Sequence, residues 1–324
     1  MAKETEIKLR VSPAMLAKLR EHTLLAKRCV GQWQTRELLN RYYDTADFAL
    51  AHGQVALRIR RDGEQLIQTL KSKGASVAGL SERNEWDWYL KSDQLVLEYL
   101  DDNCWPNSLN ALDKGQLQVV FSTDFKRQFA ELRWVRHGVE TVVEVALDHG
   151  LVIANEQQEE ICEMELELRQ GEPTALLELA LELAADVPLM PCDISKAERG
   201  YRLFDATSYS VNAESASLAA GMSLDDSLGA IAWQLLGNSQ RLAEQYRFNG
   251  HWKLFEQWLH QLISLRALLA SLGQAAPRSS SSALRTQLDE LIHDWRELAL
   301  TGSEDQAIRE ANPERFLSEL NNTR

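Results

Sequence analysis

The stretch "ETEIK", residues 4–8, decides the fold prediction because its spacing separates two kinds of side chain. If these residues form a strand, Glu4, Glu6 and Lys8 point to one face, and Thr5 and Ile7 point to the other. A single strand of this kind usually turns its charged face to water. The rest of the sequence must therefore show whether the charged face lines something else.

The same alternation of charged and apolar side chains recurs on three later predicted strands. Its charged members are Arg58 and Arg60, then Glu144 and Asp148, and finally Glu163, Glu165 and Glu167. Alternate side chains lie about 6.6 Å apart along a strand, so neighbouring carboxylates repel each other unless a cation lies between them. A divalent metal held by carboxylate oxygens is the usual remedy.

Strand patterns cover most of residues 1–205, and turn signals such as "RDGEQ" and "RHGVE" separate them. The predicted strand segments are 5–11, 41–50, 55–71, 83–90, 116–135, 141–153 and 161–171. Two helices interrupt them, one at 12–28 that Ser12 and Pro13 open, and one at 173–187 that Pro173 opens. This spacing favours an antiparallel barrel or sandwich with a few helices.

From about residue 213 the periodicity becomes helical. The predicted helices cover 223–248, 251–273, 282–300 and 304–322, with Gly273 ending the second and the serine run at 278–283 marking a loop. Trp233, Trp252, Trp258 and Trp295 fall at helical spacing and are expected in the core of this bundle. We therefore predict two domains, residues 1–205 and 213–324.

Composition excludes several classes of function. The 324 residues carry a net charge of −13, and an isoelectric point of about 5.1 argues against a nucleic-acid partner. The start of the chain lacks a signal-like apolar region and no run approaches a membrane span, so we expect a cytoplasmic protein without a membrane partner. The four cysteines, Cys29, Cys104, Cys162 and Cys192, lack the spacing of a zinc site or a disulfide framework.

The two predicted helices within residues 1–205 indicate where the charged faces point. Their apolar stripes must pack on the apolar face of the sheet, which leaves the ionic face toward the interior of a barrel. Such an interior is costly unless water, metal and a polyanion fill it. Carboxylates would then hold Mg²⁺ or Mn²⁺ while Lys and Arg hold phosphates, a combination suited to phosphoryl transfer to water.

At this point the motifs show a resemblance to a known family. "ETEIK" resembles the ExExK signature of the CYTH superfamily, also called triphosphate tunnel metalloenzymes. The segments "LRIRR", "TLK", "TDFKR", "ALDHG", "CEMELEL" and "SKAERGY" resemble later family motifs in the same order. The resemblance covers residues 2 to about 205. It implies an α+β fold in which an antiparallel β-barrel of about eight strands forms a tunnel with flanking helices, ahead of the C-terminal α-helical bundle.

The resemblance also implies roles for individual residues. Those implied to bind Mg²⁺ or Mn²⁺ are Glu4, Glu6, Asp148, Glu163 and Glu165. Those implied to hold the triphosphate are Lys8, Arg58, Arg60, Lys71, Arg127 and Lys196. The expected catalytic set is Glu4, Glu6, Lys8, Arg58, Arg60 and Lys71. Which of the three glutamates 163, 165 and 167 face the metal stays open, and the secondary candidates are Arg83, Glu85, Arg133 and Arg199.

Substrate choice follows from the branch of the family. "SKAERGY" and the helical region resemble the bacterial branch that carries a CHAD domain, which implies hydrolysis of inorganic triphosphate. The basic CHAD helix is reduced to "HQLISLRALLA", which keeps only His260 and Arg266, so we expect this domain to pack on the barrel or to mediate self-association. The alternatives are a thiamine triphosphatase, a class IV adenylyl cyclase, and a module that binds polyphosphate without catalysis.

Overall fold

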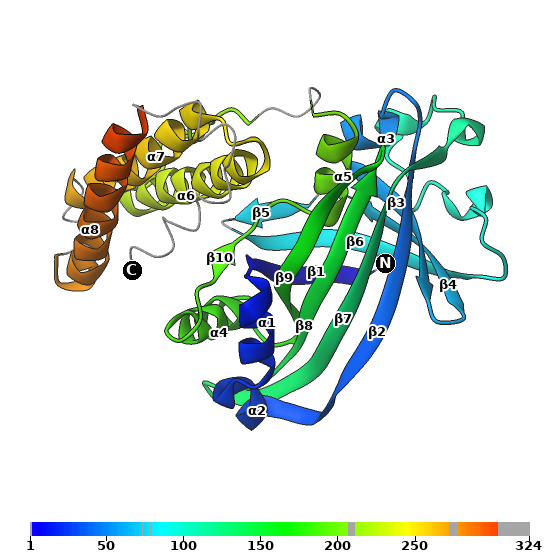
Figure 1. The fold of residues 1–324 in the computed structure, drawn as a ribbon, viewed down its shortest axis with the longest axis horizontal. Helices are drawn as coiled ribbons and strands as arrows, with labels where there is room; N and C mark the ends of the chain where they lie inside the picture. Colours follow the sequence, from blue (N-terminus) through cyan, green and yellow to red (C-terminus); the bar gives the residue numbers. More distant parts are fainter. Residues whose placement is uncertain (1, 73, 78, 207–210, 272–277, 304–324) are drawn as a thin grey trace. The chain divides into compact units, whose positions relative to one another are not determined.

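The computed structural model describes residues 2–72, 74–77, 79–206, 211–271 and 278–303 (Figure 1). The chain divides into two compact units, Met1–Tyr209 and Ser210–Arg324. The described strands belong to the first unit, and the three longest described helices belong to the second. No helix in the described ranges is long and apolar enough to cross a membrane.

An antiparallel sheet that closes on itself forms the centre of the first unit (Figure 1). β1 (Ala2–Arg10) pairs with β9 (Gln157–Gln170) on one side and with β6 (Leu80–Leu90) on the other. Between β9 and β6 the order is β8 (Val139–Ala154), β7 (Gln118–Arg136), β2 (Cys29–Asp44), β3 (Val55–Asp62) and β4 (Gln65–Ser72). Short strands β10 (Met190–Pro191) and β5 (Ala75–Val77) pair with β1 and β6. The predicted antiparallel barrel of about eight strands is confirmed.

The alternation in "ETEIK" separates the inside of the barrel from an outer hydrophobic core. Ile7 and Leu9 are buried in a core that also contains buried residues of α1 (Pro13–Arg20), α2 (Thr23–Arg28) and α4 (Thr174–Ala184). Glu6 and Lys8, one residue out of phase, are only 7% and 5% exposed and point to the other face. The prediction that helices cover the apolar face, leaving the ionic face inside, is therefore confirmed.

A second core covers the outer face of β3 and β4. Leu57 and Leu70 pack with Leu50 of α3 (Ala49–His52) and with Trp105 and Leu109 of the segment between β6 and β7. That segment contains the 3₁₀ turns η1 (Leu97–Tyr99), η2 (Asn107–Leu109) and η3 (Lys114–Gln116). Each fully buried side chain of this size contributes about 1.5–3 kcal/mol of transfer free energy, so the outer cores can support an ionic interior.

Several predicted boundaries are wrong. The helix predicted at 12–28 is two helices, because the chain turns at Glu21 and His22. The strand predicted at 41–50 begins much earlier, at Cys29, and ends at Asp44, after which α3 begins. The serine run at 278–283, predicted as a loop, opens helix α8 (Arg278–Ser303), since serine is only moderately unfavourable in a helix.

In the second unit, α6 (Leu224–Asn249) packs with α7 (Trp252–Ser271), and α7 packs with α8. An aromatic cluster fills the space between them, with the rings of Trp258 and Trp295 at 4.4 Å and Phe255 between Tyr246 and Trp295. The prediction that Trp252, Trp258 and Trp295 lie in the core is confirmed, whereas Trp233 is 45% exposed. Gly273 and the helix predicted at 304–322 lie outside the described residues.

Candidate active site

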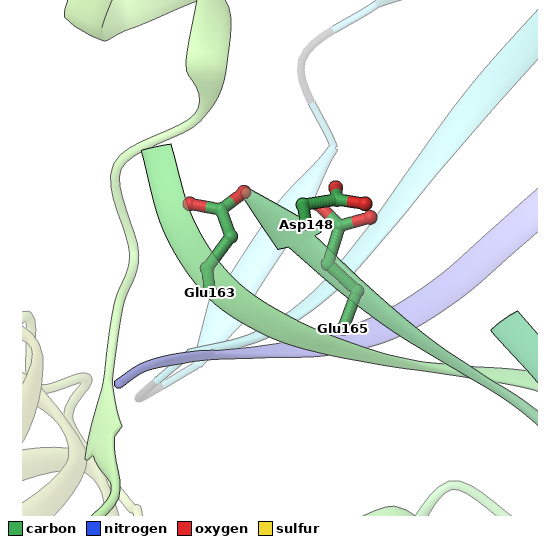
Figure 2. A group of neighbouring side chains, drawn as sticks. All are labelled: Asp148, Glu163 and Glu165. Atoms are coloured by element: carbon green, nitrogen blue, oxygen red, sulfur yellow. The ribbon is translucent and has the colours of Figure 1, made fainter. Parts of the chain in front are cut away.

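Three carboxylates from two neighbouring strands converge inside the barrel. Asp148 on β8 lies directly opposite Glu163 on β9, and Glu165 follows on the same face of β9 (Figure 2). Each offers an oxygen that lies within 4.8 Å of the others. Asp148 is fully buried and Glu163 is 1% exposed. Carboxylate oxygens are the ligands that Mg²⁺ and Mn²⁺ prefer, so this group, called the carboxylate cluster below, fits a hard divalent cation.

Two of the residues predicted to hold triphosphate donate hydrogen bonds to the carboxylate cluster. Lys196, at the start of α5 (Lys196–Phe204), donates to Asp148 at 2.7 Å, to Glu165 at 2.9 Å and to Glu163. Arg127 on β7 donates through Nε and Nη2 to both oxygens of Asp148, at 2.8 and 2.7 Å, and also contacts Glu165. Acid and base therefore meet at one place, although their motifs lie far apart in the sequence.

The residues of "ETEIK" lie beside this cluster. The Nζ atom of Lys8 is 3.3 Å from Glu6 and 3.6 Å from Glu165. Glu4 accepts a hydrogen bond of 2.7 Å from Lys71, which is also 3.3 Å from Glu85. Glu4 and Glu6 thus bond to lysines and lie outside the group of three converging carboxylates, so the structure brings together only part of the predicted metal set.

Two arginines of β3 extend the basic surface of the interior. Arg58 is 3.6 Å from Glu85, and Arg60 donates to Asn40 at 2.8 Å. Burial and the nearby charges of Arg58 and Arg127 lower the pKa of Arg60 to about 10. Because a guanidinium stays charged at neutral pH, this shift reflects the cost of burying a cation beside other cations, a cost that a bound anion would reduce.

Ionic partners keep the interior charged. Burial disfavours the charged form of Lys8 and Lys196, but the carboxylates around them raise both pKa values above the ordinary lysine value. Burial likewise opposes ionisation of Glu165, yet Lys196, Arg127 and Lys8 hold its pKa well below the usual range. Glu165 is therefore a carboxylate, not a neutral acid, at neutral pH.

The sequence did not show which of the three glutamates of β9 face the metal site. The geometry favours two of them. Glu167 pairs with Arg169 at 2.6 Å, away from the carboxylate cluster. Burial and the nearby charges of Glu4 and Glu144 raise its pKa to about 8, so Glu167 is largely protonated at neutral pH. Glu163 and Glu165 remain as the members of β9 that face Asp148.

The secondary candidates divide in the same way. Arg199 is fully buried and donates to Glu163 at 3.2 Å, and Glu85 pairs with Lys71 and Arg58. Arg83 lies opposite Glu4 in the pairing of β1 with β6. Arg133 differs, because its side chain is 46% exposed and pairs with Glu131 and Glu140. The structure therefore separates Arg133 from the interior site.

Comparison with known proteins identifies the family. The CYTH domain family matches residues 2–201 of the chain. The chain belongs to the CYTH domain family. Over 203 residues, 63% of this chain, it is 34% identical to an inorganic triphosphatase of Haemophilus influenzae, of which it spans 55%. The CYTH resemblance predicted from "ETEIK" and the later motifs is confirmed.

Solved structures give weaker likenesses to this CYTH domain. A Hippeastrum protein, described as a candidate adenylyl cyclase with a dominant triphosphatase activity, is 22% identical with a TM-score of 0.43. The alignment covers 63% of this chain and 96% of that one. A protein of Pyrococcus horikoshii is 18% identical with a TM-score of 0.37, and the alignment covers 60% and 97% of the two chains.

Asp44 is a buried aspartate that the sequence analysis did not identify. It helps to position α5 in this CYTH domain. Asp44 is fully buried at the end of β2 and accepts hydrogen bonds from the backbone of Thr45, Leu50 and Ala51 at 2.7, 2.8 and 3.0 Å. The hydroxyl of Tyr201 on α5 also donates to it at 2.7 Å. The Asp-Thr pair after a strand is a helix-start signal, but it could not show that Asp44 also anchors α5 and hence Lys196.

We expect Asp44→Ala to lower the free energy of unfolding of the barrel by about 2–4 kcal/mol, because it leaves several buried donors without an acceptor. Tyr201→Phe removes one of these hydrogen bonds and should cost only about 1 kcal/mol. Thermal and denaturant unfolding of the purified chain would measure both. Asp124→Ala, at an exposed position on β7, is the matched control. An Asp44→Ala midpoint equal to that of this control would contradict the anchoring role.

Proposed function

We propose that the protein hydrolyses inorganic triphosphate to diphosphate and phosphate inside the barrel with the help of Mg²⁺ or Mn²⁺. The observation that carries this proposal is the meeting of Asp148, Glu163 and Glu165 with Lys196 and Arg127 in a closed barrel. Membership of the CYTH family and the 34% identity to an inorganic triphosphatase support it. The pattern combines ligands for a divalent cation with cations for a polyanion.

The metal ligands in this proposal are the carboxylate cluster, with Glu4 and Glu6 as further ligands from β1. When bound, a divalent cation would make the attacking water more acidic and would neutralise negative charge on the phosphates. Nearby cations hold the pKa of Glu165 well below its usual range, so this member of the cluster need not lose a proton before it binds a cation.

The basic residues would hold and orient the substrate. Their proposed members are Lys8, Arg58, Arg60, Lys71, Arg127 and Lys196. Arginine can bind two phosphate oxygens at once, which fixes the direction of the phosphate chain, whereas a lysine acts as a point charge. As the bond to the leaving diphosphate breaks, negative charge grows on that group, and fixed cations beside it lower the barrier. Lys8, Arg58, Arg60 and Lys71, with Glu4 and Glu6, form the proposed catalytic set.

A phosphate-release assay tests the proposed function. The full chain is incubated with tripolyphosphate and Mg²⁺ or Mn²⁺, and the same reaction with EDTA is the control. Metal-dependent release of one phosphate per triphosphate is the expected result. Thiamine triphosphate and ATP are run alongside, and faster turnover of either one, or cyclic AMP from ATP, would overturn the choice of substrate. Saturable binding of tripolyphosphate without release would favour a binding module.

The helical unit is proposed to have a separate role. We infer that the tunnel domain, residues 1–205, carries the chemistry, and that the helical domain, residues 213–324, supports self-association. The exposed Trp233 on α6 favours this inference, since exposed tryptophans are enriched at protein interfaces. Sedimentation velocity of the full chain tests it, and a monomer over the whole range of accessible concentrations would contradict it.

A further inference from the structure

Helix α5 carries a row of cations toward β9 at three-residue spacing. Lys196 begins the row, and Arg199 and Arg202 follow, fully buried and 1% exposed respectively. The guanidinium of Arg199 uses three nitrogens: Nε donates to Glu159 at 2.8 Å, Nη1 donates to Glu163 at 3.2 Å, and Nη2 donates to the backbone carbonyl of Glu160. Two of these contacts hold the guanidinium in place, and the third reaches the carboxylate cluster.

The two oxygens of Glu163 have different partners. Lys196 Nζ contacts Oε1 of Glu163, and the same atom contacts one oxygen each of Asp148 and Glu165. Oε1 therefore faces the centre of the carboxylate cluster, while Oε2 faces Arg199. The last torsion of a glutamate has a broad energy profile, so hydrogen-bond partners decide how its carboxylate is turned.

We propose that Arg199 is a positioning residue that holds Oε2 of Glu163 and thereby turns Oε1 toward a divalent cation shared with Asp148 and Glu165. This inference rests on the proposed metal-dependent function. A guanidinium suits the task because its planar fork can bind the backbone, Glu159 and Glu163 together, which a lysine ammonium cannot do in the same geometry. Groups that orient metal ligands typically change metal affinity by about 10- to 100-fold.

The competing explanation is that Arg199 only fastens α5 to β9 by neutralising Glu159. Arg202 distinguishes the two explanations, because it donates to the same oxygen of Glu159, also at 2.8 Å, from the next turn of the same helix. If fastening were the whole role, removal of either arginine would have similar effects on metal binding. If Arg199 orients Glu163, only its removal should weaken the metal site strongly.

The experiment measures binding of Mn²⁺ alone to the full chain, by titration calorimetry and by the electron paramagnetic resonance signal of free Mn²⁺, with no phosphate present. We expect Arg199→Met to raise the dissociation constant of Mn²⁺ by about 10- to 100-fold and Arg202→Met to change it by less than about threefold. Arg199→Lys keeps the charge but not the fork, so it should give an intermediate value. Thermal unfolding is followed for each variant, and if Arg199→Met does not fold, Arg199→Lys decides.

Three outcomes would overturn the inference. A folded Arg199→Met, or a folded Arg199→Lys where it decides, that binds Mn²⁺ as the unaltered chain does would show that Glu163 needs no such support. Equal weakening by Arg202→Met would show that fastening of α5 is the whole effect. If the unaltered chain does not bind Mn²⁺ at all, the proposed function fails first, and this inference fails with it. Binding by the unaltered chain without hydrolysis of triphosphate would leave the positioning role supported and remove the activity.

Discussion

Asp148→Asn is expected to lower the rate of triphosphate hydrolysis by about 10³-fold, the largest effect of any single change at the site. The substitution removes one proposed metal ligand and the carboxylate that binds Arg127 through both oxygens. It leaves the charges of Arg127 and Lys196 with less compensation in a buried place, so the free energy of unfolding without metal should fall by about 3–5 kcal/mol.

Phosphate release from tripolyphosphate and titration with Mn²⁺ would measure the loss at Asp148, and thermal unfolding would measure the cost in stability. Glu160→Gln is the control, because Glu160 lies on β9 next to the cluster but is exposed and pairs with His149. If hydrolysis and Mn²⁺ binding in Asp148→Asn equal those of this control, the assignment of Asp148 as a metal ligand is contradicted.

Arg60→Met is expected to lower kcat/KM for triphosphate by about 10²-fold, because it removes a proposed two-oxygen contact to the phosphates. Unlike Asp148→Asn, it should not lower the free energy of unfolding. Burial, together with repulsion by Arg58 and Arg127, lowers the pKa of Arg60, so its cation is disfavoured in the free protein. Removing that repulsion should leave the free energy of unfolding unchanged or raise it, despite the lost hydrogen bond to Asn40.

Steady-state kinetics and thermal unfolding of the same preparation would test both statements about Arg60. The neighbouring Arg61→Met is the matched control, since the Arg61 side chain is 51% exposed and pairs with Asp93 outside the interior site. An unaltered KM and kcat in Arg60→Met would remove this residue from the set proposed to hold the triphosphate. A large loss of stability would contradict the repulsion argument.

Much of the barrel could be predicted because strand geometry has a period of two. The alternation of Glu6 and Lys8 with Ile7 and Leu9 was enough to predict an ionic inside and an apolar outside, because the apolar faces of the amphipathic helices had to be buried against the apolar face of the sheet. The first half of β2 escaped prediction because its residues are mostly exposed on both faces, so its sequence shows no alternation. A strand that buries neither face needs no alternation of apolar and polar residues.

The site was less predictable than the barrel, since its selection depends on partners distant in the sequence. Glu163, Glu165 and Glu167 have the same spacing, yet Arg169 pairs with Glu167, whereas Lys196 contacts Glu163 and Glu165. Asp44 gave a local helix-start signal, but its bond to Tyr201 joins positions far apart along the chain. Period two predicts the face of a strand on which a side chain lies, and only tertiary packing chooses among the members of that face.

The closure of the ring through β1 has a consequence for how the protein is made. Glu6 pairs in register with Ser81 on one side and with Glu167 on the other, so β1 is synthesised well before β9 and gains its second neighbour only once β9 has been made. Pairings so distant along the chain make folding slow and expose unpaired strand edges meanwhile. A chaperone that shields the unpaired edge of β1 would therefore act on the step that assembles the ring.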